Sequence, residues 1–476
     1  MQTRLLIGGK WIETGITSLV RDAFSDAEFA RVSLGDEATL ALAIGAAKDA
    51  FAQTRRVPAH ERASMLWRVV REIERRRAEF VEVIIREAGK PIVSAEAEVA
   101  RAILTFTCAA EEARRWNGAS GEVLALDATS PGEGHVGFAR RFPIGVISAI
   151  TPFNFPLNLV AHKVAPCLAT GNTMVVKPAL KTPLTALLLG EVLLAAGMAP
   201  GQINFVMCHN EHAARLVTDE RVAMVSFTGS PVVGWKLKEL AGKKKVCLEL
   251  GGNAGVIVHA DADIESAVPM IATGGFANAG QSCISVQRIV VHGSIYEEFK
   301  ERFIAHCRGN VRMGDPRDRA TVVGPMITAE ALAKTRALIA SAVAAGGRIV
   351  LGGEAHGFCL EATVLEDVPL SHDACTGELF APVVTLHRYD AFDDALRIVN
   401  DSSFGLQAGI FTNDIRLAMR AYESLDVGAV LINQVPTWRV ENMPYGGIKD
   451  SGFGREGVRY AMEEMTELKA MIIRNT

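Results

Sequence analysis

Four loops of this 476-residue chain carry side chains that could do chemistry. One of them holds Cys283 directly after Gly280-Gln281-Ser282, where small neighbours leave room for a substrate to approach the sulfur. A thiolate can attack a carbonyl carbon and form a covalent intermediate. Most free cysteines, however, are inert core residues. Taken alone, Cys283 is therefore either a nucleophile or a packed core side chain.

Two other loops follow short apolar runs and offer polar groups. Asn154 lies between Pro152 and Pro156, which hold the backbone extended. Its amide could stabilise an oxyanion or could simply make a turn. Glu249 lies on an apolar strand before Gly251-Gly252. Burial would raise the pKa of this carboxyl toward a value useful for a general base, although a structural glutamate fits equally well.

The fourth loop is Phe227-Thr228-Gly229-Ser230-Pro231-Val232-Val233-Gly234. Small residues at the start of a helix expose backbone N–H groups that suit a phosphate. The loop matches neither the G-x-G-x-x-G fingerprint nor the P-loop. A phosphate site and a tight turn between strand and helix are therefore equally compatible with it.

The elements around these loops indicate an α/β protein. Strand–helix alternation from Arg140 onward predicts a parallel sheet covered on both faces, and the alternation restarts after Lys245 as a second unit. Such sheets bind ligands at the carboxyl ends of their strands. The predicted strands are 145–150, 173–176, 202–206, 222–226, 246–250, 289–291, 349–351 and 383–386; the predicted helices include 185–196, 211–218 and 272–279.

Other segments have less definite patterns. After a strand and turn at 5–11, the residues up to about 115 have helical periodicity. The glycine-rich tract 117–137 and the tail 469–474, which resembles an exposed strand, fit neither sheet.

Composition excludes several classes of protein. A hydrophobic fraction of 49% excludes a disordered chain, and a net charge of −4 gives no positive field for nucleic acid or an anionic membrane. The residues contain neither a signal-peptide pattern nor a membrane span, and the eight cysteines form no Cys-x-x-Cys pair. We expect a cytoplasmic protein that binds no metal.

An ordered series of motifs resembles the aldehyde dehydrogenase superfamily over essentially the whole chain. The residues of these motifs are similar to the branch of lactaldehyde, non-phosphorylating glyceraldehyde-3-phosphate, sulfolactaldehyde and phosphonoacetaldehyde dehydrogenases. The motifs are Pro152-Phe153-Asn154-Phe155-Pro156, Lys177-Pro178, Phe227-Thr228-Gly229-Ser230, Leu248-Glu249-Leu250-Gly251-Gly252, Gly280-Gln281-Ser282-Cys283, Glu378-Leu379-Phe380-Ala381-Pro382-Val383 and Pro444-Tyr445-Gly446-Gly447-Ile448-Lys449-Asp450-Ser451-Gly452.

The resemblance implies roles for the first three residues. Cys283 would be the nucleophile, and the Asn154 amide with the Cys283 backbone N–H would hold the thiohemiacetal oxyanion. Hydride transfer to the nicotinamide would leave a thioester, and Glu249 would activate water to release the carboxylic acid.

The resemblance also implies a dinucleotide site for NAD or NADP. Lys177 and Glu378 match positions that hold the two riboses, Phe380 supports the nicotinamide, and Ser230 contacts the pyrophosphate. Further expected contacts are Gly229, Gly234, Pro152, Phe153 and Leu180. NAD-preferring members often carry Glu where this chain has Leu180, which Lys181 follows. NAD is slightly favoured if Lys181 faces solvent.

Family members have three structural parts. The corresponding division here would be an NAD(P)-binding domain at 1–117 and 139–248, a catalytic domain at 249–461, and an oligomerisation flap at 118–138 and 462–476. Edge strands of such a flap pair between subunits, so a homodimer or homotetramer is expected.

The expected substrate is a short hydrophilic aldehyde, with an anionic aldehyde as the narrower hypothesis. Arg101 and Arg439 are the candidate anion contacts. Their alternatives are a helix-packing ion pair for Arg101 and a subunit contact for Arg439. Ser282 stands where phosphonate-type members have Arg, which weakens a phosphonate assignment.

Two competing functions remain open. A CoA-acylating relative would share the cysteine but typically lacks the base at Glu249. A non-catalytic structural relative would not need Asn154, Glu249 and Cys283 together.

Overall fold

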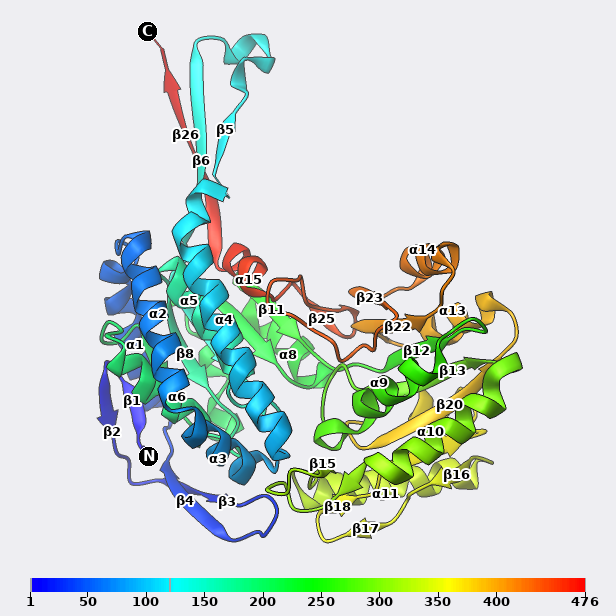
Figure 1. Cartoon of the computed structure of the whole chain (residues 1–476). Coiled ribbons are helices and arrows are strands. Elements are labelled where there is room, and N and C mark those ends of the chain that lie inside the picture. The colour runs from blue at the N-terminus through cyan, green and yellow to red at the C-terminus, as the bar shows by residue number, and fades with distance from the viewer. Residues whose placement is uncertain (1, 120, 476) are drawn as a thin grey trace.

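A computed structural model describes residues 2–119 and 121–475 of the chain. Two helix-covered sheets lie side by side, and a narrow arm of strands projects from one of them (Figure 1). The predicted α/β class is confirmed. Met1, Ser120 and Thr476, which belong to the predicted domain ranges, lie outside the described residues.

The first sheet has eight strands, of which the middle five, from β9 to β11, run parallel. Its order is β2 (Lys10–Ile12), β1 (Leu5–Ile7), β9 (Ile203–Phe205), β8 (Thr173–Lys177), β7 (Val146–Ile150), β10 (Val222–Thr228), β11 (Lys245–Glu249) and β25 (Gly452–Phe453). The helices associated with it are α1 (Glu37–Thr54), α2 (Ala59–Arg75), α3 (Arg77–Ala88), α4 (Ile92–Ala119), α5 (Asn158–Thr170), α6 (Leu184–Ala195), α7 (Arg215–Thr218), α8 (Pro231–Ala241) and α15 (Val458–Glu464).

The second sheet has seven strands and is parallel except at β16. Its order is β16 (Arg348–Leu351), β19 (Thr363–Glu366), β20 (Val383–Tyr389), β13 (Val286–His292), β12 (Ala254–Val258), β22 (Gln407–Phe411) and β23 (Ala429–Ile432). The helices are α9 (Ile264–Phe276), α10 (Tyr296–Asn310), α11 (Ala329–Ala344), α12 (Asp373–Thr376), α13 (Phe392–Asn400) and α14 (Ile415–Ser424).

Alternating side chains show that both sheets are covered on two faces. On β10, Met224 joins the large core with α1 and α5, whereas Val225 joins a separate cluster with α8. On β12, Val256 and Ile257 likewise belong to different clusters. Because successive strand residues point to opposite faces, each sheet has a core on either side.

Smaller pairs of strands connect these units. They are β3 (Thr17–Arg21) with β4 (Glu28–Ser33), β14 (Arg312–Met313) with β15 (Thr321–Val323), β17 (Ala355–His356) with β18 (Cys359–Leu360), and β21 (Phe404–Gly405) with β24 (Ile448–Lys449). The sequence did not predict the β3–β4 hairpin, which lies in the segment expected to be helical.

Two helix predictions were wrong. Residues 211–218 form a 3₁₀ turn and the four-residue α7, because only Leu216 and Val217 are buried there to hold a helix. The predicted helix 272–279 ends at Phe276, since Asn278 and Ala279 have left-handed φ values of 54°. Helix α9 therefore stops before the cysteine loop.

The projecting arm is a three-stranded antiparallel sheet of β26 (Thr466–Arg474), β6 (His135–Pro143) and β5 (Glu122–Leu124) (Figure 1). It exposes apolar side chains, among them Met471 and Ile472 at 58% and 51%. An exposed apolar edge of this kind suits pairing with a strand of another chain. The oligomerisation role of the arm remains a prediction.

The domain division also remains a prediction. Strand β25 pairs with β11, and Val458 and Met462 of α15 belong to the first core. The stretch from Gly452 to Glu464 therefore packs with the first sheet, although most of it falls inside the predicted catalytic range 249–461.

No helix in the described part of the chain is both long and apolar enough to cross a membrane.

A buried carboxylate fixes the start of α5 beside the loop that carries Asn154. Glu98 on α4 accepts hydrogen bonds from the backbone N–H groups of Leu157 (2.9 Å) and Asn158 (3.1 Å). The same carboxylate pairs with Lys90, and both side chains are fully buried. One acidic group thus satisfies a helix start and a buried ammonium together.

Replacing Glu98 with Ala should therefore lower the free energy of unfolding by about 3–5 kcal/mol, because it leaves the Lys90 charge buried and unpaired. Glu96→Ala on the same helix is the matched control: its pair with Arg319 is exposed, and its loss should cost far less stability. Urea unfolding of both variants measures the difference, and equal losses would contradict this account.

Candidate active site

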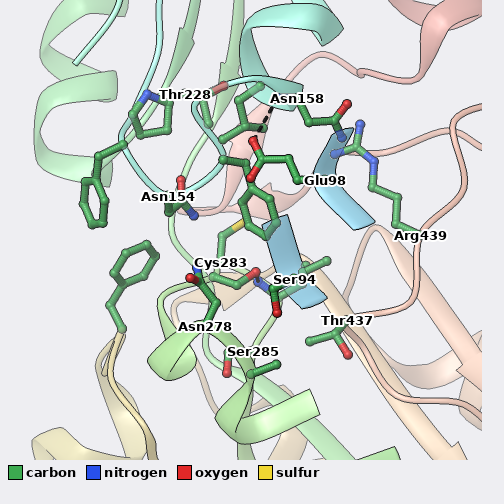
Figure 2. Close-up of a pocket in the computed structure, with 18 of the residues that line it drawn as sticks. Ser94, Glu98, Asn154, Asn158, Thr228, Asn278, Cys283, Ser285, Thr437 and Arg439 are labelled. Carbon is green, nitrogen blue, oxygen red and sulfur yellow. Dashed lines mark hydrogen bonds between the residues drawn. The ribbon is translucent and has the colours of Figure 1, made fainter. Parts of the chain in front are cut away.

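A cavity of about 630 Å³ opens where loops of both sheets meet. Its walls come from the loops after β7, β10 and β11, from the segment 277–285 before β13, from helix α4, and from residues 437–445. Figure 2 shows Asn154, Cys283 and Arg439 among the side chains that line it. The predicted residues that line it are Cys283, Asn154, Pro152, Phe153, Gly229, Ser230, Glu378, Phe380, Arg101 and Arg439.

Cys283 lies half-buried in this cavity on a loop that needs glycine. Gly280 has a φ of +63°, and a Cβ there would lie 2.1 Å from the carbonyl oxygen of Ala381. The Cys283 sulfur lies 3.2 Å from the hydroxyl of Tyr445. Burial raises the pKa of the Cys283 thiol to about 12, although the Tyr445 hydrogen bond acts in the opposite direction. The resting sulfur is therefore a thiol at neutral pH.

Asn154 lies next to the cysteine loop. Its side chain is buried, and its Nδ2 donates to the carbonyl oxygen of Gln281 at 3.0 Å. This bond aims the amide at the segment that carries Cys283. An amide held there can donate its second hydrogen to an oxyanion that forms on a carbonyl attacked by the sulfur.

Glu249 is placed differently from the other two. It ends β11, is buried, and does not line the cavity. Among the described residues neither carboxylate oxygen has a hydrogen-bond partner. Burial, followed by the nearby charge of Glu456, raises the pKa of Glu249 well above its usual value, against the opposing charges of Arg439 and Lys163. Its surroundings therefore favour the uncharged form of Glu249.

A chain of buried charged groups extends behind the cavity. Lys163 Nζ donates to Glu456 at 2.8 Å, and His162 Nε2 lies 2.7 Å from Glu441 Oε2. Burial would raise the pKa of Glu456, but Lys163 and His162 outweigh it and hold this pKa far below the usual range. Glu456 therefore keeps the negative charge that Glu249 lacks.

The two predicted anion contacts have different surroundings. Arg101 Nη2 donates to Glu441 Oε1 at 2.9 Å, so the ion pair proposed as its alternative exists, and its side chain is 29% exposed. Arg439 is buried within this chain, where its Nη2 donates to His162 Nδ1 at 3.2 Å. The alternative of a subunit contact for Arg439 is therefore wrong, because the side chain does not reach the surface.

The other end of the cavity has features of a nucleotide site. Glu378 Oε1 accepts from the backbone N–H of Gly252 at 2.9 Å, and burial raises the Glu378 pKa to about 7. The rings of Phe153 and Phe380 pack edge to face, with 5.9 Å between the ring centres. Ser230 caps α8, whose first turn faces the cavity through Gly229 and Ser230. A phosphate would find free N–H groups there.

Three predicted cofactor contacts do not line the cavity. Lys177 ends β8, is buried, and donates to Asn210 Oδ1 at 3.1 Å. Gly234 packs inside α8, where a Cβ would lie 2.3 Å from the Leu250 side chain. Leu180 packs against the first core, and Lys181 beside it is exposed. The condition on which NAD was favoured, a solvent-facing Lys181, is met.

Several site residues were missed from the sequence. Tyr445 belonged to a recognised motif but received no role, and Asn158, His162, Lys163 and Glu456 were not singled out. Lys163 did leave a signal, since it is a charged residue inside the otherwise apolar helix α5. Its partner Glu456 lies 293 residues away, so the pairing itself could not be read from local pattern.

The chain belongs to the aldehyde dehydrogenase family, whose sequence model, described as "Aldehyde dehydrogenase family", matches residues 11–471. The resemblance inferred from the motifs is confirmed, and the protein is an oxidoreductase that acts on aldehydes.

Relatives cover the whole length of the chain. A 3-sulfolactaldehyde dehydrogenase of Priestia aryabhattai is 39% identical over 99% of this chain and 98% of its own. The crystal structure of aldehyde dehydrogenase 21 from Physcomitrella patens, in complex with the reaction product succinate, has a TM-score of 0.96 at 41% identity, covering 99% and 98%. Glyceraldehyde-3-phosphate dehydrogenase GapN from Methanocaldococcus jannaschii, complexed with NADP, has a TM-score of 0.92 at 36% identity, covering 97% and 100%. The predicted fold and branch are confirmed.

The Glu378 carboxyl gives a prediction about pH. Its native pKa of about 7 exceeds the usual 4.5, so the native protein holds a proton that the unfolded chain releases between these values. Glu378 therefore costs stability progressively as pH rises from 4.5 to 7. Glu378→Gln keeps an acceptor for Gly252 and removes this dependence.

We expect Glu378→Gln without cofactor to match the wild type near pH 4.5 and to exceed its free energy of unfolding by about 3 kcal/mol above pH 7. Unfolding midpoints across this pH range measure the difference. A difference independent of pH would show that the carboxyl titrates normally.

Proposed function

We propose that the protein oxidises a short anionic aldehyde to its carboxylic acid, with Cys283 as nucleophile and NAD or NADP as hydride acceptor. The observation that carries the anionic part is that two arginines, Arg101 and Arg439, line one end of the cavity, with Lys163 behind them. Arg101, Arg439 and Lys163 face only two ionised carboxylates there, Glu441 and Glu456.

The third carboxyl nearby, Glu249, lies outside the cavity lining, and its raised pKa favours the uncharged form. His162 lies between these groups: its Nδ1 accepts from Arg439, and its Nε2 faces Glu441. A buried charge without a partner is costly. A carboxylate or sulfonate on the substrate would supply the missing negative charge.

Unpaired donors support the same substrate class. Arg439 Nε and Asn158 Nδ2 have no hydrogen-bond partner among the described residues, and both side chains line the cavity. Donors without acceptors favour a ligand rich in oxygen atoms. The names of two relatives agree with this reading, since sulfolactaldehyde carries a sulfonate and succinate carries two carboxylates.

In the proposed reaction the Cys283 thiolate attacks the aldehyde carbon and forms a C–S bond. The oxyanion accepts hydrogen bonds from Asn154 Nδ2 and from the backbone N–H of Cys283. A bound nicotinamide would supply the acceptor for the hydride that leaves this carbon. The resulting thioester on Cys283 is then hydrolysed by water, whose proton goes to the Glu249 carboxylate.

Glu249 must turn toward the cavity, and lose its proton, to serve as this base. A Cβ on residue 446 would lie only 2.9 Å from Oε1 of Glu249. The glycine at this position therefore leaves room for the carboxyl group. A carboxyl with a raised pKa is suited to take a proton from water near neutral pH. The presence of Glu249 favours hydrolysis over transfer of the acyl group to CoA.

The residues around the cavity fit a nicotinamide dinucleotide. Glu378 and Lys177 would hold the riboses, Gly229 and Ser230 at the start of α8 would hold the pyrophosphate, and Phe380 would support the nicotinamide. Leu180 offers no carboxylate to a ribose, so NAD and NADP both fit, with NAD slightly favoured by the exposed Lys181.

The test is nicotinamide reduction at 340 nm with NAD and NADP, across sulfolactaldehyde, succinic semialdehyde, lactaldehyde, glyceraldehyde-3-phosphate, phosphonoacetaldehyde and propanal. Arg101→Leu should raise KM for the preferred anionic aldehyde by about 10- to 100-fold, the loss expected for a charge-assisted hydrogen bond. For propanal the change should stay below about threefold.

Arg319→Leu is the control, because this exposed arginine contacts α4 through Glu96 but lies outside the cavity lining. Equal effects of Arg101→Leu on charged and neutral aldehydes would contradict the anionic substrate. Turnover that persists in Cys283→Ser would contradict the nucleophile.

A further inference from the structure

Tyr445 is the side chain in hydrogen-bond contact with the Cys283 sulfur. Its hydroxyl lies 3.2 Å from Sγ, and no other such contact to this sulfur is found among the described residues. The Asn154 amide donates to the carbonyl oxygen of Gln281. Glu249 and Arg439 influence the sulfur through charge.

The direction of this hydrogen bond follows from the surroundings of Tyr445. Burial, together with the nearby Cys283, raises the pKa of the Tyr445 hydroxyl well above its usual value. The phenol therefore keeps its proton and is the donor whenever the sulfur is a thiolate. A donor to a charged acceptor stabilises the charged form.

The Tyr445 ring is held on several sides. The Arg439 guanidinium lies over it at 3.6 Å from the ring centre, and the ring packs with Ile284 and Leu406. Its backbone exchanges hydrogen bonds with Glu456, at 2.9 Å from N–H to carbonyl and 2.6 Å in return. These contacts place the Tyr445 hydroxyl next to the sulfur independently of the hydrogen bond between the two groups.

We propose that Tyr445 donates its phenol hydrogen to Sγ of Cys283, so that it favours the reactive thiolate and fixes the direction in which the sulfur faces the cavity. The proposal rests on the proposed role of Cys283 as nucleophile. It assigns to Tyr445 a part in the reaction, beyond filling space.

Tyr445→Phe tests this directly, because it removes the hydroxyl and keeps the ring under Arg439. The measurement is the rate of Cys283 alkylation by iodoacetamide between pH 6 and 10, with the Cys283 peptide quantified by mass spectrometry. Loss of a hydrogen bond to a charged group should raise the thiol pKa by about one to two units. The rate at each pH below that pKa should fall about 10- to 100-fold.

Tyr389→Phe is the matched control. Tyr389 is also buried, and its hydroxyl bonds to His259 Nδ1 at 2.7 Å outside the cavity lining. This variant should lose a comparable amount of stability and leave Cys283 alkylation unchanged.

Equal alkylation rates in Tyr445→Phe and wild type would overturn the proposal. So would a rise in labelling of buried Cys167, because the ring would then serve packing alone. Alkylation of Cys283 needs no aldehyde, so this experiment tests the role of Tyr445 separately from the proposed function. If the proposed function were wrong, Cys283→Ser would still turn over aldehyde. A drop in kcat/KM for Tyr445→Phe that has the same size at each pH below that pKa would accompany the expected result.

Discussion

The buried pair of Lys163 and Glu456 is the interaction on which the rest of the site depends. The two side chains are 1% and 3% exposed and lie 2.8 Å apart, joining α5 of the first sheet to the segment before α15. Glu456 also pairs through its backbone with Tyr445. One ion pair therefore helps to position the group that contacts the nucleophile. It also fixes the negative charge that, after burial, raises the pKa of Glu249.

Burial gives the site a neutral resting state. Burial raises the pKa values of the Cys283 thiol and of the Glu249 carboxyl, so it favours the uncharged form of both groups. The fixed charges belong instead to Arg439, Lys163 and Glu456, which are held in low-dielectric surroundings where their fields act strongly. This arrangement leaves the sulfur in its thiol form and fits the anionic substrate that we propose.

The sequence was most informative where a residue type and its loop together define the chemistry. Cys283, Asn154, Glu378 and Phe380 were predicted from motifs, and they share one cavity. Local pattern was less informative where the backbone departs from regular geometry, as at Ala279, where a left-handed φ ends the predicted helix early.

Long-range pairing was out of reach for a different reason. His162 meets Glu441 across 279 residues, and Arg101 meets Glu441 across 340. Periodicity reports which face of a helix is buried, but it does not report which distant charge lies opposite. For the same reason the sequence indicated Arg439 as a candidate without indicating that it is buried over Tyr445.

The central claim is that Cys283 carries the acyl group during turnover. Its most direct test is acid-quenched turnover by Glu249→Gln with NAD or NADP and the preferred aldehyde, followed by mass mapping of the peptides. The account predicts one acyl group per subunit on the peptide that contains Cys283, because the thioester forms but its hydrolysis is slowed. An unmodified Cys283 peptide during steady formation of the acid would contradict it.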